Sequence, residues 1–464
     1  MNEKKRGSFT GGIGFVLAAA GSAVGLGNLW RFPYLAAQNG GGIFLLVYVL
    51  LALTFGFALM TTEIAIGRRT KKSPIKAYGE INKKFGFLGV LSAVVPFIIF
   101  PYYCVIGGWV TKYTADFMIG QGMQTVADGY FWGFITSQWS PIIWTAIFMG
   151  ATALIVLAGV DKGIEKFSKV LMPILCVLIV AIAVFTITIK GTDGRTALEG
   201  LKIYLVPDFS GMTVGKFFKV LLDAMSQMFY SMSIAMGIMI TYGSYTKDDT
   251  NLVKSVNQIE IFDTAIALLA GMIMIPVVYA FQGTKGLEAS GPSLLFVSLP
   301  KVFEAMGFIG HFVGAAFFVL VVFAAITSSI SIMEAINSVM MDKFGWSRKK
   351  SCFVILGISA AIALVTCLGY NILYFEVTLP NGKAEQQLLD VFDYLTNNML
   401  MPIVAFVTCI LIGWVAKPKY VVGEVKKNGE KFGREMLYNV MIKFVAPVFL
   451  ILIFLSAFGV FKKL

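Results

Sequence analysis

A segment near the N-terminus combines helix-breaking residues with polar groups that could bind a cation. The run GSAVGLGNLWRFP begins at Gly21 and lies inside the apolar stretch 11–37, which is long enough to cross a membrane. Each interior glycine costs a helix about 1 kcal/mol relative to alanine, and non-helical backbone is tolerated inside a membrane where it lines a cavity. The oxygens released by such a break suit a small hard cation. They are the carbonyls of Gly21, Ala23 and Val24 and the side-chain oxygen of Asn28.

The same residues admit a second interpretation. Small residues at Gly21 and Gly25 also fit a close helix interface of the small-xxx-small type. Asn28 and Arg31 favour a binding site instead, because an amide or ionisable group at bilayer depth is costly and usually marks a functional position. The segment therefore predicts a broken helix that lines a cavity.

Polar side chains interrupt three other apolar stretches. Glu63 and Asp263 are carboxylates among apolar neighbours, and such a group is not buried without a cation or a proton. Thr327 and Ser328 are adjacent hydroxyls, which commonly bond back to the backbone of their own helix. The residues alone leave two interpretations of these hydroxyls open, as cation ligands or as back-bonded helix residues.

Composition places these residues in a polytopic membrane protein. The chain has 464 residues, of which 57% are hydrophobic and 14% charged, and its mean hydropathy of +0.79 exceeds that of soluble globular proteins. Apolar runs of about 20 residues or more predict membrane spans. The predicted spans, eleven in all, are 11–37, 43–67, 87–117, 141–159, 167–189, 215–245, 257–281, 309–341, 351–373, 391–416 and 438–461.

Basic residues indicate the orientation of these spans. The net charge is +12, and most lysines and arginines outside the spans lie in segments on the same side as the N-terminus. By the positive-inside rule the N-terminus is cytoplasmic and, with eleven spans, the C-terminus is extracytoplasmic. The basic surplus thus reflects topology, and no nucleic-acid partner is expected. The five cysteines, all in apolar stretches and none in a C-x-x-C pair, predict neither a disulfide nor a zinc framework.

The run GSAVGLGNLWRFPYLAAQNGGG resembles the first-helix signature of the neurotransmitter:sodium symporter family, the LeuT-type amino acid transporters. The resemblance extends through nearly all of the chain and points to MhsT-type bacterial carriers of hydrophobic amino acids. It implies the LeuT fold, an all-α polytopic membrane protein. In this fold two five-helix repeats of inverted orientation, with broken helices 1 and 6, are followed by an eleventh helix.

The resemblance also divides the chain. The sixth span carries only a weak break signal of its own, two serines and one glycine, and Ala235 stands where close relatives have glycine. The expected segments are a cytoplasmic N-terminal segment at 1–10, the first repeat at 11–190, the second repeat at 191–416 with an extracytoplasmic hairpin at about 286–308, and a cytoplasmic loop with the last helix at 417–464.

Residue by residue, the resemblance implies a substrate pocket between two sodium sites, with Glu63 supporting the broken helix. The substrate-binding positions are Ala23, Gly25, Gly27, Ile99, Tyr103, Tyr230, Ser231, Ser233, Met236, Ser328 and Ile332. The first sodium site is formed by Ala23, Asn28, Ser231 and Asp263, and the second by Gly21, Val24, Ala324, Thr327 and Ser328.

The resemblance further implies two gates and a point of unwinding. Gly163 and Pro173 match the family element that unwinds on the inner side. The expected gate pairs are Arg31 with Asp393 on the outside and Arg6 with Asp342 on the inside.

The expected ions are two co-transported Na⁺, with no chloride requirement. Ala267 stands where chloride-dependent relatives have a serine, and Asp263 supplies a fixed negative charge instead. Tyr48, Gln227 and Ser231 retain the other chloride-site positions.

These features predict a sodium-coupled symporter in the plasma (inner) membrane of a prokaryote. Its expected partners are the lipid bilayer and an amino acid, which the adaptable Met236 suggests is large and hydrophobic or aromatic; a monomer is expected to suffice for transport. A substrate sensor or channel of the same fold and a proton-coupled amino acid carrier are the alternatives. An enzyme is not expected, because an intramembrane hydrolase needs a nucleophile with a base and the one histidine lies beside no serine or cysteine motif.

Overall fold

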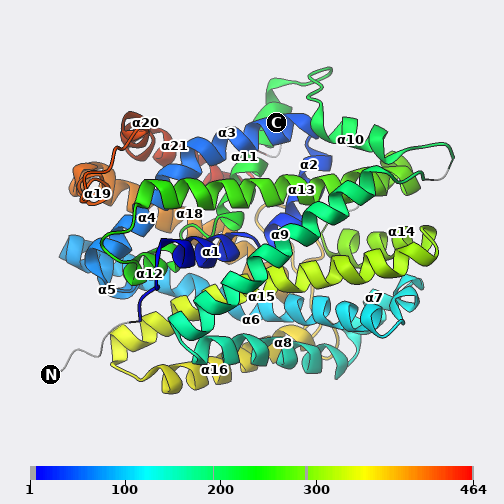
Figure 1. The fold of residues 1–464 in the computed structure, drawn as a ribbon, viewed down its shortest axis with the longest axis horizontal. Coiled ribbons are helices and arrows are strands. Elements are labelled where there is room, and N and C mark those ends of the chain that lie inside the picture. The colour runs from blue at the N-terminus through cyan, green and yellow to red at the C-terminus, as the bar shows by residue number, and fades with distance from the viewer. Residues whose placement is uncertain (1–6, 192, 288–290, 462–464) are drawn as a thin grey trace.

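The longest helices run roughly parallel along the length of the molecule (Figure 1); they are α6 (Gly86–Met118), α13 (Leu252–Gly286) and α15 (Phe308–Phe344). The computed structural model describes residues 7–191, 193–287 and 291–461, and the regular elements in these ranges are all helices. A helix satisfies its backbone hydrogen bonds internally, which is what allows a chain to cross a bilayer.

The other elements are distributed on both sides of these long helices. Those before residue 210 are α1 (Gly12–Ala23), η1 (Gly27–Arg31), α2 (Phe32–Gln38), α3 (Gly42–Leu51), η2 (Ala52–Gly56), α4 (Phe57–Thr70), α5 (Pro74–Ile81), η3 (Lys83–Phe85), η4 (Gly122–Val126), α7 (Tyr130–Thr136), α8 (Ser140–Leu157), η5 (Val160–Glu165), α9 (Lys166–Ile187) and α10 (Ala197–Leu205). Those after it are α11 (Val214–Ser231), α12 (Ile238–Tyr245), η6 (Leu294–Ser298), α14 (Leu299–Ala305), α16 (Arg348–Leu368), α17 (Leu388–Asp393), η7 (Tyr394–Leu400), α18 (Met401–Ile410), η8 (Leu411–Val415), α19 (Lys419–Val425), α20 (Glu435–Val440), η9 (Met441–Val445) and α21 (Ala446–Ala457).

Ten of the predicted spans have a counterpart of spanning length. Within the described ranges 9 helical stretches are long and apolar enough to cross a membrane, and the bent pair of α1 with η1 and α2 makes a tenth. The remaining predicted span, 215–245, is divided into α11 and α12, with residues 232–237 between them outside any helix. Neither half is both long and apolar enough to span, because α12 has only 8 residues and α11 carries the charged side chains of Lys216, Lys219 and Asp223.

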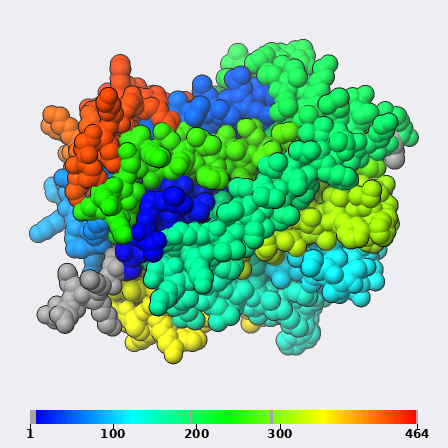
Figure 2. Space-filling model, in the orientation of Figure 1, coloured from blue at the N-terminus to red at the C-terminus, as the bar shows by residue number. Residues whose placement is uncertain are grey.

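The first broken helix lies at the centre of the bundle. α1 is bordered by α9, α13 and α15 (Figure 1), and one part of it reaches the surface between α9 and α13 (Figure 2). The chain leaves helical geometry at Val24, where φ is −76° and ψ is 97°, and the two halves of the span meet at 48°. The last carbonyls of α1 therefore have no helical donors.

Glycines bring α4 and α12 into backbone contact. A Cβ atom on Gly67 would lie 2.0 Å from the carbonyl oxygen of Ile240, and one on Gly243 would lie 2.4 Å from that of Ile64. Small residues that allow such close approach are typical of helix interfaces in membranes. This contact fixes α12, the second half of the divided sixth span, against α4.

An ionic cluster holds the loops at one end of α4. Arg68 is buried, donates from Nε to Glu424 at 2.6 Å and donates to the Thr250 carbonyl at 2.6 Å. In the loop before α13, hydrogen bonds from Lys71 and Lys427 lower the pKa of Asp248 to about 2. The cluster thus ties α19 and the start of α13 to α4.

The α4–α12 contact predicts the cost of enlarging its glycine. Gly67→Ala should destabilise the protein by about 1–3 kcal/mol, because the added methyl group must push two backbones apart. The matched control is Gly357→Ala in α16, where a Cβ would meet nothing within 4 Å; there alanine should be neutral or stabilising. Thermal unfolding of the purified variants measures both effects. Equal midpoints for the two variants would contradict the proposed helix contact.

Candidate functional site

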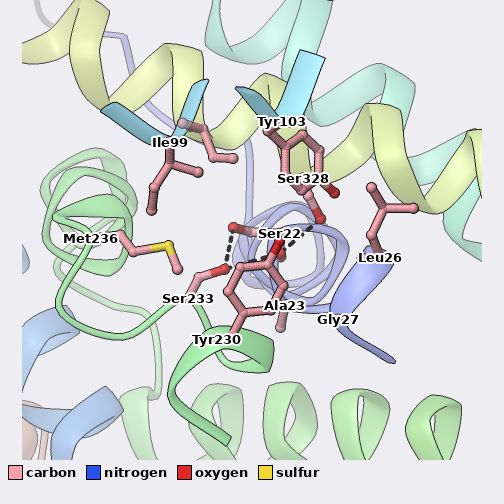
Figure 3. Close-up of a pocket in the computed structure, with 12 residues that line it drawn as sticks. Ser22, Ala23, Leu26, Gly27, Ile99, Tyr103, Tyr230, Ser233, Met236 and Ser328 are labelled. Atoms are coloured by element: carbon pink, nitrogen blue, oxygen red, sulfur yellow. Dashed lines mark hydrogen bonds between the residues drawn. The ribbon is translucent and has the colours of Figure 1, made fainter. Parts of the chain in front are cut away.

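A small pocket lies where the two interrupted helices meet (Figure 3). Its volume is about 20 Å³, so a bulky ligand requires its walls to move. Every predicted substrate-binding residue lines it except Ser231, and Ser22 and Leu26 join them. The lining residues are Ser22, Ala23, Gly25, Leu26, Gly27, Ile99, Tyr103, Tyr230, Ser233, Met236, Ser328 and Ile332.

The pocket has one apolar and one polar side. Figure 3 shows Ile99 and Met236 on one side and the hydroxyl groups of Tyr103 and Ser328 on another. The Tyr103 hydroxyl is buried and has no hydrogen-bond partner in the described part of the chain. The Ser328 side chain and the Leu26 backbone lie next to it, so this hydroxyl can donate at the pocket wall. Gly25 allows this arrangement, because a Cβ there would lie 2.4 Å from the Ser328 hydroxyl oxygen.

One oxygen-rich cluster is centred on Asp263, whose side chain is fully buried. Its carboxylate accepts hydrogen bonds from Asn28 Nδ2 at 2.8 Å, Ser231 Oγ at 2.6 Å and the Tyr48 hydroxyl at 3.1 Å. Of the residues predicted for the first sodium site, the structure brings Asn28, Ser231 and Asp263 into direct contact, and Ala23 lines the adjacent pocket. Tyr48 joins them, although the sequence resemblance placed it only near a chloride position.

A second oxygen-rich cluster joins the end of α1 to α15. Ser328 Oγ lies 3.4 Å from the carbonyl oxygen of Gly21, 3.0 Å from that of Ser22 and 3.3 Å from that of Val24. Thr327 Oγ1 donates within its own helix to the Ala324 carbonyl at 3.0 Å. The residues predicted for the second sodium site thus converge, and the donor set of carbonyl and hydroxyl oxygens fits a hard cation.

The break between α11 and α12 is held by an acidic side chain. Ser233, Ala235 and Gly237 have positive φ angles of 52°, 63° and 71°, a region that costs residues other than glycine about 1–2 kcal/mol each. Glu63 Oε1 accepts a hydrogen bond from the Ala235 backbone nitrogen at 2.7 Å. The sequence left the extent of this break open, and the structure shows that alanine at position 235 does not restore the helix.

A larger cavity of about 810 Å³ adjoins the pocket. Leu26 and Tyr230 line both spaces, so their side chains stand between them. Arg31 and Asp393, the predicted outer gate, both line the larger cavity, but no ion pair joins them within the described residues. Arg31 donates to Ser226 Oγ at 3.0 Å, and its guanidinium carbon lies 5.6 Å from the centre of the Tyr230 ring. The cavity keeps the two gate residues apart.

The predicted inner elements lie at the opposite end of the pocket-lining helices. Asp342 Oδ2 accepts a hydrogen bond from the Ser73 backbone nitrogen at 2.7 Å, whereas Arg6 falls outside the described residues. Gly163 lies within the wide turn of η5, and Pro173 lies inside α9. The structure thus combines an irregular helix start with an internal proline at the predicted unwinding element.

Sequence reasoning missed two lining residues, Ser22 and Leu26. Both belong to the glycine-rich run that indicated the site, yet a serine and a leucine in an apolar stretch do not stand out from their neighbours. Their position inside the run of glycines and small residues around the break was the available signal.

The fold and the site together define a polytopic membrane carrier, in which a central pocket is built from two interrupted helices and flanked by oxygen-rich clusters. The chain belongs to the sodium:neurotransmitter symporter family, because the sequence pattern of that family matches residues 6–122 and 136–464. Its function is therefore sodium-coupled transport and not catalysis.

Individual relatives and one solved structure agree with this membership. The chain is 33% identical to the uncharacterised sodium-dependent transporter YhdH of Bacillus subtilis over 99% of each chain. It is 32% identical to an uncharacterised sodium-dependent transporter of Methanocaldococcus jannaschii, over 99% of this chain and 92% of the relative. The crystal structure of MhsT in complex with L-phenylalanine matches 98% of this chain and 100% of its own, with a TM-score of 0.86 and 34% identity. The fold is thus the LeuT fold.

The backbone at position 235 predicts a stabilising substitution. Ala235→Gly should raise the free energy of unfolding by about 1 kcal/mol, because glycine adopts φ 63° without the steric cost that alanine bears. Ala361→Gly in the middle of α16 is the control and should lower stability by about 1 kcal/mol. Thermal unfolding in one detergent compares them. A loss of stability in both variants would show that Ala235 bears no strain.

Proposed function

We propose that this protein imports large hydrophobic or aromatic L-amino acids, driven by two co-transported Na⁺ ions, by alternating access. The observation that carries the proposal is the position of the pocket, between the Asp263 cluster and the Thr327–Ser328 cluster, with an apolar wall at Ile99 and Met236. The solved MhsT structure, which contains L-phenylalanine, supports the substrate class.

Each end of a zwitterionic amino acid has a matching group in the pocket. The unpartnered Tyr103 hydroxyl is suited to donate to a carboxylate, as are the half-helix N-termini that follow each break. The ammonium group is suited to the carbonyls of the unwound 232–237 segment, whose Ser233 and Met236 line the pocket. The side chain then extends toward the apolar wall formed by Ile99, Met236 and Ile332.

Buried charge accounts for the sodium coupling. The Asp263 carboxylate has three hydrogen-bond donors around it but no lysine or arginine among them. A cation beside it would compensate the negative charge in a low-dielectric site, where unit charges 4 Å apart interact by about 4 kcal/mol at an effective dielectric constant of 20. The uncharged Thr327–Ser328 cluster offers a second cation a set of oxygen ligands.

Alternating access requires the pocket to open to one side at a time. The large cavity lies on one side of Tyr230 and contains Arg31 and Asp393, so closing it would bring these side chains together over the pocket. On the other side, movement of α1 relative to η5 and α9 would open a path. We place the cavity on the extracytoplasmic face and the N-terminus in the cytoplasm of a prokaryotic cell, in accord with the positive-inside rule.

The Asp263 cluster also favours transport without chloride. The Tyr48 and Ser231 hydroxyls, which a chloride ion would need as donors, both donate to the Asp263 carboxylate. Ala267 is buried one helical turn away and has no hydroxyl to offer. The fixed carboxylate therefore takes both the charge and the donors of an anion site.

Uptake into proteoliposomes tests the proposal. Under an imposed Na⁺ gradient the protein should accumulate labelled phenylalanine, and a panel of twenty amino acids should show competition strongest from large hydrophobic and aromatic ones. Thr327→Val removes one cation ligand at nearly constant shape and should lower the apparent Na⁺ affinity at least tenfold. Thr366→Val in α16, where the hydroxyl bonds only to its own helix, is the control.

Three outcomes would contradict this account in whole or in part. Equilibration of phenylalanine without accumulation would indicate a channel, and accumulation driven by a proton gradient alone would indicate a proton-coupled carrier. Unchanged sodium dependence in Thr327→Val would remove the second cation site.

The size of the pocket predicts an effect at Met236. Met236→Phe replaces a flexible side chain with a rigid ring at the apolar wall, so it should weaken uptake of tryptophan or tyrosine about tenfold more than uptake of alanine or valine. Competition of each amino acid against labelled substrate gives the ratio. An equal loss across all substrates would mean that Met236 supports the fold and does not set substrate size.

The occupied donors around Asp263 predict indifference to chloride. Replacing chloride by gluconate should leave sodium-driven uptake unchanged in the wild type. The double variant Asp263→Asn with Ala267→Ser loses the fixed charge and gains a hydroxyl, so its uptake should come to require chloride. A large chloride requirement in the wild type would overturn this part of the proposal.

A further inference from the structure

The two interrupted helices are joined directly by a pair of serine hydroxyls. Ser22 Oγ donates to Ser233 Oγ at 3.1 Å, and Ser233 Oγ donates to the Ser22 carbonyl at 3.0 Å (Figure 3). Each hydroxyl uses its single proton once, so both bonds coexist. The two side chains are 3% and 4% exposed and line the central pocket. This hydroxyl pair holds Ser233 in its left-handed conformation at φ 52°.

The Ser22 carbonyl also connects the pair to the Thr327–Ser328 cluster. Of the three carbonyl oxygens near Ser328 Oγ, that of Ser22 is the closest, at 3.0 Å. The other two belong to Gly21 and Val24, which are the backbone ligands proposed for the second cation. The Ser22 carbonyl is thus the one acceptor of the three that has no part in binding the ion.

Cation binding removes the freedom of the Ser328 proton. A hydroxyl that ligates a cation directs its lone pairs to the ion, so its proton must point to another acceptor. With Gly21 and Val24 facing the ion, that acceptor is the Ser22 carbonyl. This carbonyl then accepts from Ser328 and Ser233 together, and the position of Ser233 in the pocket wall depends on the ion.

We propose that the Ser22–Ser233 hydroxyl pair transmits sodium binding at the Thr327–Ser328 cluster to the amino acid pocket. The two serines are positioning residues for transport, since they act through Ser328 and the backbone of the second break. The inference rests on the proposed function, because it requires that Na⁺ and an amino acid bind to these sites.

The coupling between the two ligands is the quantity to measure. The full chain, purified in detergent, is titrated with labelled L-phenylalanine at low and at saturating Na⁺, with choline as the replacement cation. The ratio of the two dissociation constants is the coupling factor. Ser22→Ala should reduce this factor at least fivefold, because it removes the bond from the Ser22 hydroxyl to Ser233 and leaves Ser233 held by the Ser22 carbonyl alone. Ser244→Ala, whose buried hydroxyl bonds only within α12, should leave it unchanged.

A comparison of single and double variants identifies the residues through which the pair acts. If the pair acts through the Thr327–Ser328 cluster, Ser22→Ala combined with Thr327→Val should lower the coupling factor no further than Thr327→Val alone. If Ser22→Ala fails to fold, Ser233→Gly takes its place, because glycine accepts the same positive φ and also lacks the hydroxyl.

The outcomes separate the inference from the proposed function. If Ser22→Ala weakens phenylalanine binding equally at both Na⁺ concentrations, the coupling factor is unchanged, the pair is merely structural and the inference fails alone. Additive losses in the double variant would show that the pair acts independently of the Thr327–Ser328 cluster and would also overturn the inference. If wild-type binding does not depend on Na⁺ at all, the proposed function fails first.

Discussion

The structure depends on how backbone carbonyls are satisfied where two helices are interrupted in an apolar interior. In water such carbonyls would bind solvent, but within a bilayer each unsatisfied polar group costs several kcal/mol. Here the carbonyls of Gly21, Ser22 and Val24 face the Ser328 hydroxyl. The Ser22 carbonyl also accepts from Ser233 Oγ, but two hydroxyl protons cannot satisfy three acceptors. The excess of oxygen over donors is what makes this place suited to a cation.

The surrounding helices hold the breaks open. Glu63 accepts the Ala235 N–H and so stabilises backbone that an alanine would otherwise return to a helix. Gly67 and Gly243 lock α12 against α4. The stability of the long helices thus offsets the strain of the two breaks. Regular helices supply the stability and the irregular backbone lines the pocket.

Much of the fold followed from elementary rules, whereas the site followed only in part. Apolar length predicted nearly every span, and the glycines after Gly21 predicted the first break. The second break had little signal of its own, because it depends on the hydrogen bond from Ala235 to Glu63, which is distant in sequence. Family resemblance placed Asn28 beside Asp263, a contact that spacing alone does not reveal. It also paired Arg31 with Asp393. The distance between these two side chains depends on the width of the cavity that they line, and in the described part of the chain they form no ion pair.

The most direct test of this account is a high-resolution structure of the purified protein in Na⁺ with L-phenylalanine, compared with one in choline without it. The account predicts a cation bound by the Gly21 and Val24 carbonyls and Ser328, and a second beside Asp263 and Asn28. The phenylalanine carboxylate should meet the Tyr103 hydroxyl, with its ring toward Met236. Phenylalanine bound only in the large cavity, or both breaks closed into continuous helices with no bound cation, would contradict it.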